Sequence, residues 1–134
     1  MLIVDNHKKL SKSWYSSLAN NKSTTVDAKP KKVFFTLQFL GWLKSLRDTK
    51  AAAKIKARLK RVEESGSLGD WKYLDFGVSE FRLGGRGGYR IYFGEIEEGI
   101  LILSGGHHDT QSRNIEQAKG LLADYEQRKD FTED

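Results

Sequence analysis

Cysteine is absent from this 134-residue chain, and proline occurs once, at Pro30. The lack of cysteine excludes disulfides and thiolate chemistry, and it is typical of proteins that work in a reducing cytoplasm. No apolar run approaches the ~20 residues that a membrane-spanning helix needs, so no membrane partner is expected. The adjacent histidines His107 and His108 have no third ligand at metal-binding spacing, so neither a metal site nor a cofactor is expected.

Acidic residues are scarce in the first half of the chain. Residues 1–62 carry 15 Lys and Arg but only three acids, a net charge of +12, whereas residues 63–134 carry eight basic residues and 15 acids, a net charge of −7. A basic block of this kind indicates a phosphate backbone as partner. A solvated, lysine-rich helix face explains it equally well when charge is the only observation.

Composition divides the chain at about residue 31. The spacing of Leu10, Trp14 and Leu18 predicts a short helix over His7 to Ala19, and the polar stretch that follows, with the single proline, is typical of a linker. Residues 1–31 are therefore expected to be an N-terminal extension, and residues 32–134 a single domain.

The rest of the chain predicts a small α+β fold in the order β-α-α-β-β-β-α, with a mainly antiparallel sheet packed against a helical hairpin and a C-terminal helix. Thr36 is the expected N-cap of the first helix. The expected elements are a strand at 33–37, helices from about 38 to 47 and 50 to 64, a strand at 71–76, a hairpin at 78–92, a central strand at 100–104 and a helix at about 111–127.

The predicted hairpin brings two arginines and a glutamate together on one face. A glycine-rich loop centred on Arg86 would place Arg82 opposite Arg90 and Glu80 opposite Tyr92, all four on one face, while the alternate residues form an apolar face. Like charges opposed across a ladder are destabilising, so the arginine pair indicates an anion site. Neutralisation by Glu80 and solvent on an ordinary sheet face is an equally good explanation.

Five stretches from about residue 32 to residue 125 resemble the RelE/ParE superfamily of bacterial toxins, and most closely its HigB-like, phage-associated branch of addiction-module killer proteins. The matching stretches, in order, are FLGWLKSLRD at 39–48, KIKARLKRVEESGSLGDWK at 54–72, GVSEFR at 77–82, GYRIYF at 88–93 and GGHHDTQSRNI at 105–115. Residues 1–31 lie outside this resemblance.

The resemblance implies the toxin of a type II toxin–antitoxin system, acting in the cytoplasm as a ribosome-dependent, metal-independent mRNA endoribonuclease. Its partners would be the ribosome, mRNA and a cognate antitoxin, a small helix-turn-helix DNA-binding protein. In this family the arginines that match Arg82 and Arg90 bind the phosphate. The family pattern GGDKxxQ has a cation where this chain has His108, an imidazole that can exchange a proton near neutral pH.

Other residues have a functional and a structural interpretation of similar weight. Tyr92 could stack on a base or position the phosphate, or simply pack in the sheet. Lys72 matches a family lysine and could contact phosphate, and Gln111 matches the family pattern but also suits the first turn of a helix. RNA attachment is expected from the basic helix face, namely Lys54, Lys56, Lys60 and Arg61.

Two other functions are compatible with the same resemblance. A ParE-like protein would poison DNA gyrase by binding, without hydrolysis, and the fold cannot distinguish it from a nuclease. A nucleic-acid-binding member of the fold with weak catalysis is the third possibility. The combination of Arg82, Arg90 and His108 favours the nuclease, because a protein that only binds has no need of it.

Overall fold

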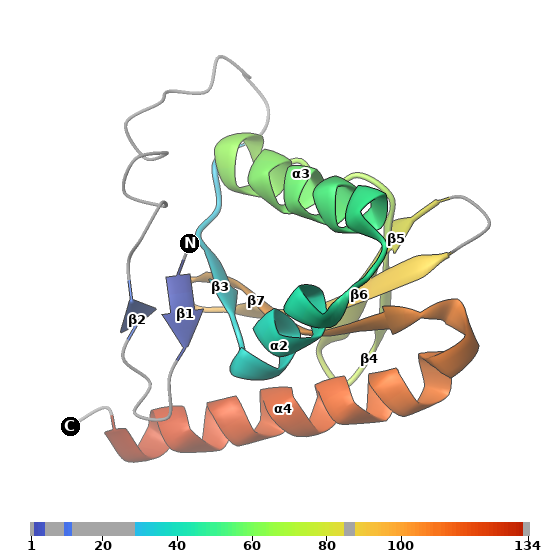
Figure 1. Ribbon diagram of the computed structural model, residues 1–134. Coiled ribbons are helices and arrows are strands. Elements are labelled where there is room, and N and C mark those ends of the chain that lie inside the picture. Colours follow the sequence, from blue (N-terminus) through green and yellow to red (C-terminus); the bar gives the residue numbers. More distant parts are fainter. Residues whose placement is uncertain (1, 5–9, 12–28, 85–87, 133–134) are drawn as a thin grey trace.

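The apolar run Ile100–Leu103 lies in the central strand of the sheet, as its sequence predicts. In the computed structural model of the chain (Figure 1), which describes residues 2–4, 10–11, 29–84 and 88–132, this strand is β7 (Gly99–His107). It pairs in parallel with β3 (Val33–Phe35) and antiparallel with β6 (Tyr89–Ile96). The sheet has the order β2-β1-β3-β7-β6-β5-β4.

The hairpin of β5 (Val78–Leu83) and β6 has the predicted register, with Arg82 opposite Arg90 and Glu80 opposite Tyr92. The centre of its loop, residues 85–87, lies outside the described residues. Strand β4 (Trp71–Asp75) pairs antiparallel with β5 and forms an edge of the sheet. Four strands, β4 to β7, lie between α3 and α4. The predicted order β-α-α-β-β-β-α had three strands there.

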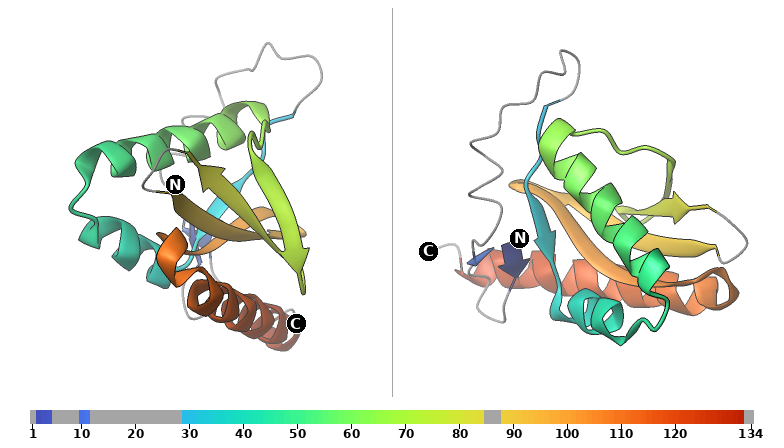
Figure 2. Two further views of the ribbon diagram at one scale, coloured as in Figure 1. Left: turned by 90° about the vertical axis from the view of Figure 1, so that its right-hand side faces the viewer. Right: turned by 45° about the horizontal axis from the view of Figure 1, so that its top comes forward.

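Three helices cover the two faces of the sheet, with α2 (Leu37–Ser45) and α3 (Thr49–Ser65) on one face and α4 (Gln111–Thr132) on the other (Figure 2). Thr36 caps α2 as expected, because its hydroxyl accepts the N–H of Phe39 at 3.1 Å. A short 3₁₀ helix, η1 (His108–Thr110), leads into α4, which continues five residues beyond its expected end. None of the described helices combines the length and the apolarity needed to cross a membrane.

Strand alternation divides the interior into two hydrophobic clusters, one on each face of the sheet. The cluster beneath α2 and α3 is built from residues that include Val33, Phe39, Ile55, Leu59, Phe81, Ile91 and Phe93. The cluster beneath α4 contains Phe34, Val78, Tyr92, Leu101, Leu103, Ala118, Leu122 and Tyr125. Ala118, Leu122 and Tyr125, spaced at i, i+4 and i+7, thus form the inward face of α4.

Two described pieces of the N-terminal extension join the sheet. Strand β1 (Leu2–Val4) pairs in parallel with β3, and β2 (Leu10–Ser11) pairs antiparallel with β1. The predicted helix from His7 to Ala19 is wrong at Leu10 and Ser11, because strand pairing takes precedence there over the helical spacing. The rest of that helix and the linker to residue 28 lie outside the described residues.

Candidate functional site

The opposed arginines of β5 and β6 share the sheet face that α4 covers. Their neighbours in the ladder show this, because Tyr92 belongs to the cluster beneath α4, whereas Phe81 and Ile91 belong to the cluster beneath α2 and α3. The alternation predicted from the sequence is therefore confirmed on both faces.

Glu80 lies between the two arginines and is fully buried. Arg82 donates from Nε to Glu80 Oε2 at 2.9 Å, and Arg90 Nε lies 3.9 Å from Oε1. Gln111, in the first turn of α4, donates from Nε2 to the same Oε1 at 3.1 Å. The buried carboxylate thus offsets the repulsion between the arginines and links them to α4.

The contacts with Glu80 leave much of each guanidinium available. Arg82 uses its Nε edge, and its terminal nitrogens have no partner within the described part of the chain; the side chain is 38% exposed. Arg90 donates from Nη1 to the carbonyl of Tyr89 at 3.2 Å and is 21% exposed. The hydrogen bond from Arg82 to Glu80 raises the pKa of Arg82 above its ordinary value, so its charge is secure. Two cations held in this way can receive an anion between them.

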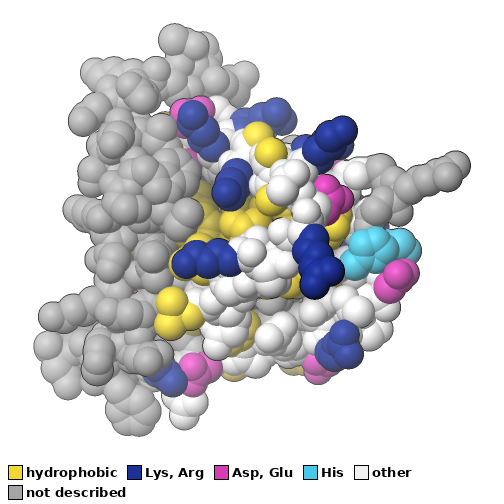
Figure 3. Space-filling model, in the orientation of Figure 1, with side chains coloured by type: hydrophobic (Ala, Val, Ile, Leu, Met, Phe, Trp, Pro, Cys, Tyr) yellow, Lys and Arg dark blue, Asp and Glu magenta, His cyan; other side chains and the backbone are white. Residues whose placement is uncertain are grey.

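His108 lies two residues beyond Gly106, which pairs with Arg90 in the β6–β7 ladder. Its backbone N–H donates to the carbonyl of Gly88 at 2.8 Å, and its ring packs so closely on Gly88 that a Cβ there would lie 2.9 Å from Nδ1. The backbone therefore brings His108 to the hairpin end that carries Arg90, where the histidines form an exposed patch (Figure 3).

The carboxylate of Asp109 lies between the two histidines, at 3.0 Å from His108 Nε2 and 3.2 Å from His107 Nδ1, and the backbone N–H of Asp109 donates to His107 Nδ1 at 3.3 Å. The two rings are 4.4 Å apart. Among the described residues these three side chains are the group that could jointly ligate a metal, but the contacts of Asp109 with both rings already account for their proximity. The two histidines do not point to opposite sides as neighbours in an extended strand would, because η1 begins at His108 and turns the chain.

Tyr92 does not lie where a substrate base could stack on it. Its ring is fully buried beneath α4, and burial raises the pKa of its phenol to about 12. A phenol in this environment keeps its proton at neutral pH and cannot act as a base. Of the interpretations that the sequence allowed for Tyr92, packing in the sheet is the one that fits its burial beneath α4.

The other residues expected to bind RNA separate into two groups. Lys72 is exposed on β4 beside Glu80 in the ladder, and Gln111 contacts Glu80 directly, so both lie next to the arginine pair. The cations of α3 lie across the sheet from that pair and are exposed. These cations are Lys54, Lys56, Lys60 and Arg61.

Arg58 lies in the basic stretch of α3, but unlike the four exposed cations it is half-buried. Its guanidinium donates to the carbonyl of Arg82 at 3.2 Å and lies 5.9 Å from the ring centre of Phe81. Arg58 thus ties α3 to the end of β5 that carries Arg82. Its position directly before Leu59, at the border of the apolar stripe, was a signal that the sequence offered.

No protein-family model matches the chain. A Haemophilus influenzae protein described as uncharacterized is 43% identical over 90 residues, which cover 66% of this chain and 88% of that protein. Among solved structures, a mutant of the Escherichia coli toxin RelE in the free state matches with a TM-score of 0.51 at 20% identity, over 66% of this chain and 98% of the other. The RelBE2 toxin–antitoxin complex of Mycobacterium tuberculosis gives a TM-score of 0.46 at 25% identity, over 61% and 98%. The match with RelE shows that this chain has a RelE-like fold.

Proposed function

The chain belongs to the same protein family as the Haemophilus influenzae protein, and on that premise, with its RelE-like fold, we propose that it is the toxin of a type II toxin–antitoxin system. Its activity is metal-independent cleavage of mRNA on the ribosome, as in the HigB-like branch that its motifs resemble. The observation that carries the proposal is the pair Arg82 and Arg90, held by the buried Glu80 next to His108.

The chemistry that suits these residues is attack of a ribose 2′-hydroxyl on the adjacent phosphorus. A bond forms between the 2′-oxygen and phosphorus, the bond from phosphorus to the 5′-oxygen breaks, and a proton moves from the first oxygen to the second. Arg82 and Arg90 offer N–H donors and positive charge to the pentacoordinate phosphorane, where negative charge accumulates. Their interactions with Glu80 hold them in place before substrate binds, which lowers the reorganisation cost.

His108 is the residue that we assign to proton transfer. Its imidazole is partly exposed at the end of the hairpin that carries Arg90. In the free protein Asp109 pairs with Nε2, but Asp109 is 72% exposed, and an exposed pair of this kind contributes little. Substrate can therefore take its place at the ring.

The same proposal names the partners. The protein acts in the cytoplasm on ribosomes that are translating mRNA, and a small helix-turn-helix antitoxin inhibits it. Lys72, beside Glu80 on the edge strand, adds a phosphate contact near the arginines. The cations of α3 attach the protein to ribosomal RNA from the other face of the sheet.

The proposal is tested by translation in vitro, with primer extension to map cuts in the mRNA. Wild type should give discrete cuts, and His108→Ala should lower the cleavage rate by ~10²–10⁴-fold and remove its pH dependence between about pH 5 and pH 8. His108→Lys should recover part of the rate with a different pH profile. Gln117→Ala, an exposed change on α4, is the control and should leave the rate unaltered.

Two outcomes would contradict the proposal in different ways. Intact mRNA together with trapped gyrase–DNA complexes would identify a gyrase poison. Cleavage with an unchanged pH profile in His108→Ala would remove His108 from the mechanism. His107→Ala is unsuitable as a control, because His107 shares Asp109 with His108.

A further inference from the structure

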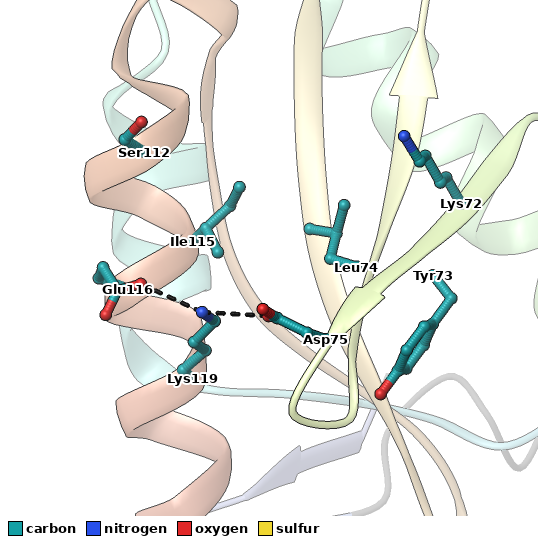
Figure 4. A pocket seen from close by; sticks show the side chains of 8 residues that line it. All are labelled: Lys72, Tyr73, Leu74, Asp75, Ser112, Ile115, Glu116 and Lys119. Carbon is teal, nitrogen blue, oxygen red and sulfur yellow. Dashed lines mark hydrogen bonds and ion pairs between the residues drawn. The ribbon is translucent and has the colours of Figure 1, made fainter.

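A groove of about 430 Å³ runs between β4 and α4 (Figure 4). Its volume lies within the range of about 300–1,000 Å³ that is usual for small-molecule sites. Apart from Lys72, to which the proposed function gives a phosphate contact, no residue of this groove has a role in the proposed chemistry. The side chains that matter for its recognition properties are Lys72, Leu74 and Asp75 from the strand, and Ser112, Ile115 and Glu116 from the helix.

One end of the groove adjoins the arginine pair. Lys72 is the ladder partner of Glu80, and Ser112 directly follows Gln111, whose amide donates to Glu80. Both walls therefore begin beside the carboxylate that holds Arg82 and Arg90. An RNA strand whose phosphate lies at the arginines would have its next nucleotide at the mouth of this groove.

The groove changes character along its length. Leu74 and Ile115, which pack against the cluster beneath α4, provide an apolar surface in the middle. At the far end Lys119 bridges Asp75 and Glu116, at 3.0 Å and 3.2 Å from its Nζ (Figure 4). Each carboxylate has a second oxygen without a partner among the described residues, so both can still accept hydrogen bonds.

We propose that this groove binds the nucleobase of the nucleotide next to the cleaved phosphate, and that it prefers guanine. The inference rests on the proposed function, which supplies the RNA. Lys72 would meet the flanking phosphate, Leu74 and Ile115 would cover the base ring, and the carboxylates would read its Watson–Crick edge. Such unpaired edges are how proteins recognise the sequence of single-stranded RNA.

Guanine follows from the chemistry of the acceptors. Carboxylates only accept hydrogen bonds, and guanine offers two neighbouring donors, N1–H and the N2 amino group, to the oxygens of Glu116 and Asp75 that Lys119 leaves unoccupied. Uracil presents a single N–H between two carbonyl oxygens, which a carboxylate repels. Lys119 limits this selectivity by keeping one oxygen of each carboxylate occupied.

The test is sequencing of the mRNA ends that the protein produces during translation in vitro. Wild type should show guanine enriched several-fold at one position next to the cut. Glu116→Gln, which gains an N–H donor, and Ser112→Tyr, which fills the groove, should each reduce that enrichment by about fivefold or more. Glu126→Gln, a change of the same chemistry on an exposed part of α4, should keep the wild-type preference.

A second measurement observes binding directly, with NMR of the methyl groups of Leu74 and Ile115. Guanosine 5′-monophosphate should shift these signals more than uridine 5′-monophosphate, and less in Glu116→Gln than in wild type. Cleavage with the same base preference in all four proteins, or equal shifts with both nucleotides, would overturn the groove assignment while the nuclease stands. A wild-type protein that leaves mRNA intact would overturn the proposed function itself and the groove assignment with it.

Discussion

The two faces of the β5–β6 hairpin use the same two strands for opposite purposes. Toward α2 and α3 the side chains are apolar, with Phe81 and Phe93 stacked at 4.1 Å between ring centres. Toward α4 the alternate positions hold Glu80, Arg82 and Arg90 in ion pairs. Because the alternation is strict, the face that stabilises the hairpin fixes where the charged face points.

The comparison extends to two buried glutamates, one on each side of the sheet. Glu80, on the α4 side, has contacts from Arg82, Arg90 and Gln111. Glu63, on α3, is equally buried, but neither of its oxygens has a hydrogen-bond partner among the described residues. Burial raises the pKa of Glu63 to about 7. The ionised form of a buried acid is thus stabilised by its partners on the charged face, whereas on the apolar face its burial lowers the stability of the fold.

The largest effect is expected from the apolar face. Phe81→Ala removes a fully buried ring and should lower the free energy of unfolding by about 3–5 kcal/mol. Phe76→Ala, where the ring is mostly exposed, is the matched control and should cost under ~1 kcal/mol. Urea denaturation measures both, and equal losses would mean that the face beneath α3 is not the stabilising one.

The next largest change in stability is expected at Glu63, and it depends on pH. Its pKa is higher in the folded protein, about 7, than the ordinary value of 4.5, so folding binds a proton and stability falls as pH rises from about 4.5 through 7. Glu63→Gln should remove this loss and stabilise the protein at pH 8 by up to about 3 kcal/mol. Melting curves at pH 5 and pH 8 measure it. The same gain at both values would show that ionisation is not the cause.

A double-mutant cycle measures how strongly Arg82 and Glu80 interact on the charged face of the hairpin. Repulsion between the arginines suggested that removing one would not lower stability, but Glu80 changes that expectation. Arg82→Ala should lower the free energy of unfolding, because it leaves the buried carboxylate of Glu80 underpaired, and adding Glu80→Gln should recover part of the loss. Arg82→Lys keeps the charge without the planar fork, so it should lower cleavage more than stability. Additive losses in the cycle would show that the two side chains do not interact.

The smallest effect of a single substitution is expected for the exposed cations of α3. Its cations are exposed, so Lys56→Glu should leave the melting temperature nearly unchanged while it weakens ribosome binding and lowers its dependence on salt. Lys44→Glu, on the neighbouring helix α2, is the control for a general loss of positive charge. Ribosome affinity that does not change with salt in the wild type would exclude the attachment role of α3.

Local rules account for what the sequence predicted well. The symmetry of the glycine-rich loop gave the register of Arg82 with Arg90, the hydroxyl of Thr36 gave the start of α2, and continuous hydrophobicity gave the central position of β7. What was missed depends on contacts that are distant in sequence. Tyr92 and Glu80 lie beneath α4, and Arg58 turns inward because the carbonyl groups of Leu68 in the following loop and of Arg82 in β5 accept its hydrogen bonds.

The parallel pairing of β3 with β7 has a consequence for the order in which the molecule assembles during its synthesis. Val33 pairs with Ile100, so β3 has to wait for 67 further residues before its central neighbour exists. The contacts of Gln111 with Glu80 and of His108 with Gly88 come later still. Non-local pairing of this kind is slow to form. A nascent chain that still lacks its last quarter therefore holds both arginines without Gln111 and His108, the groups that complete their site.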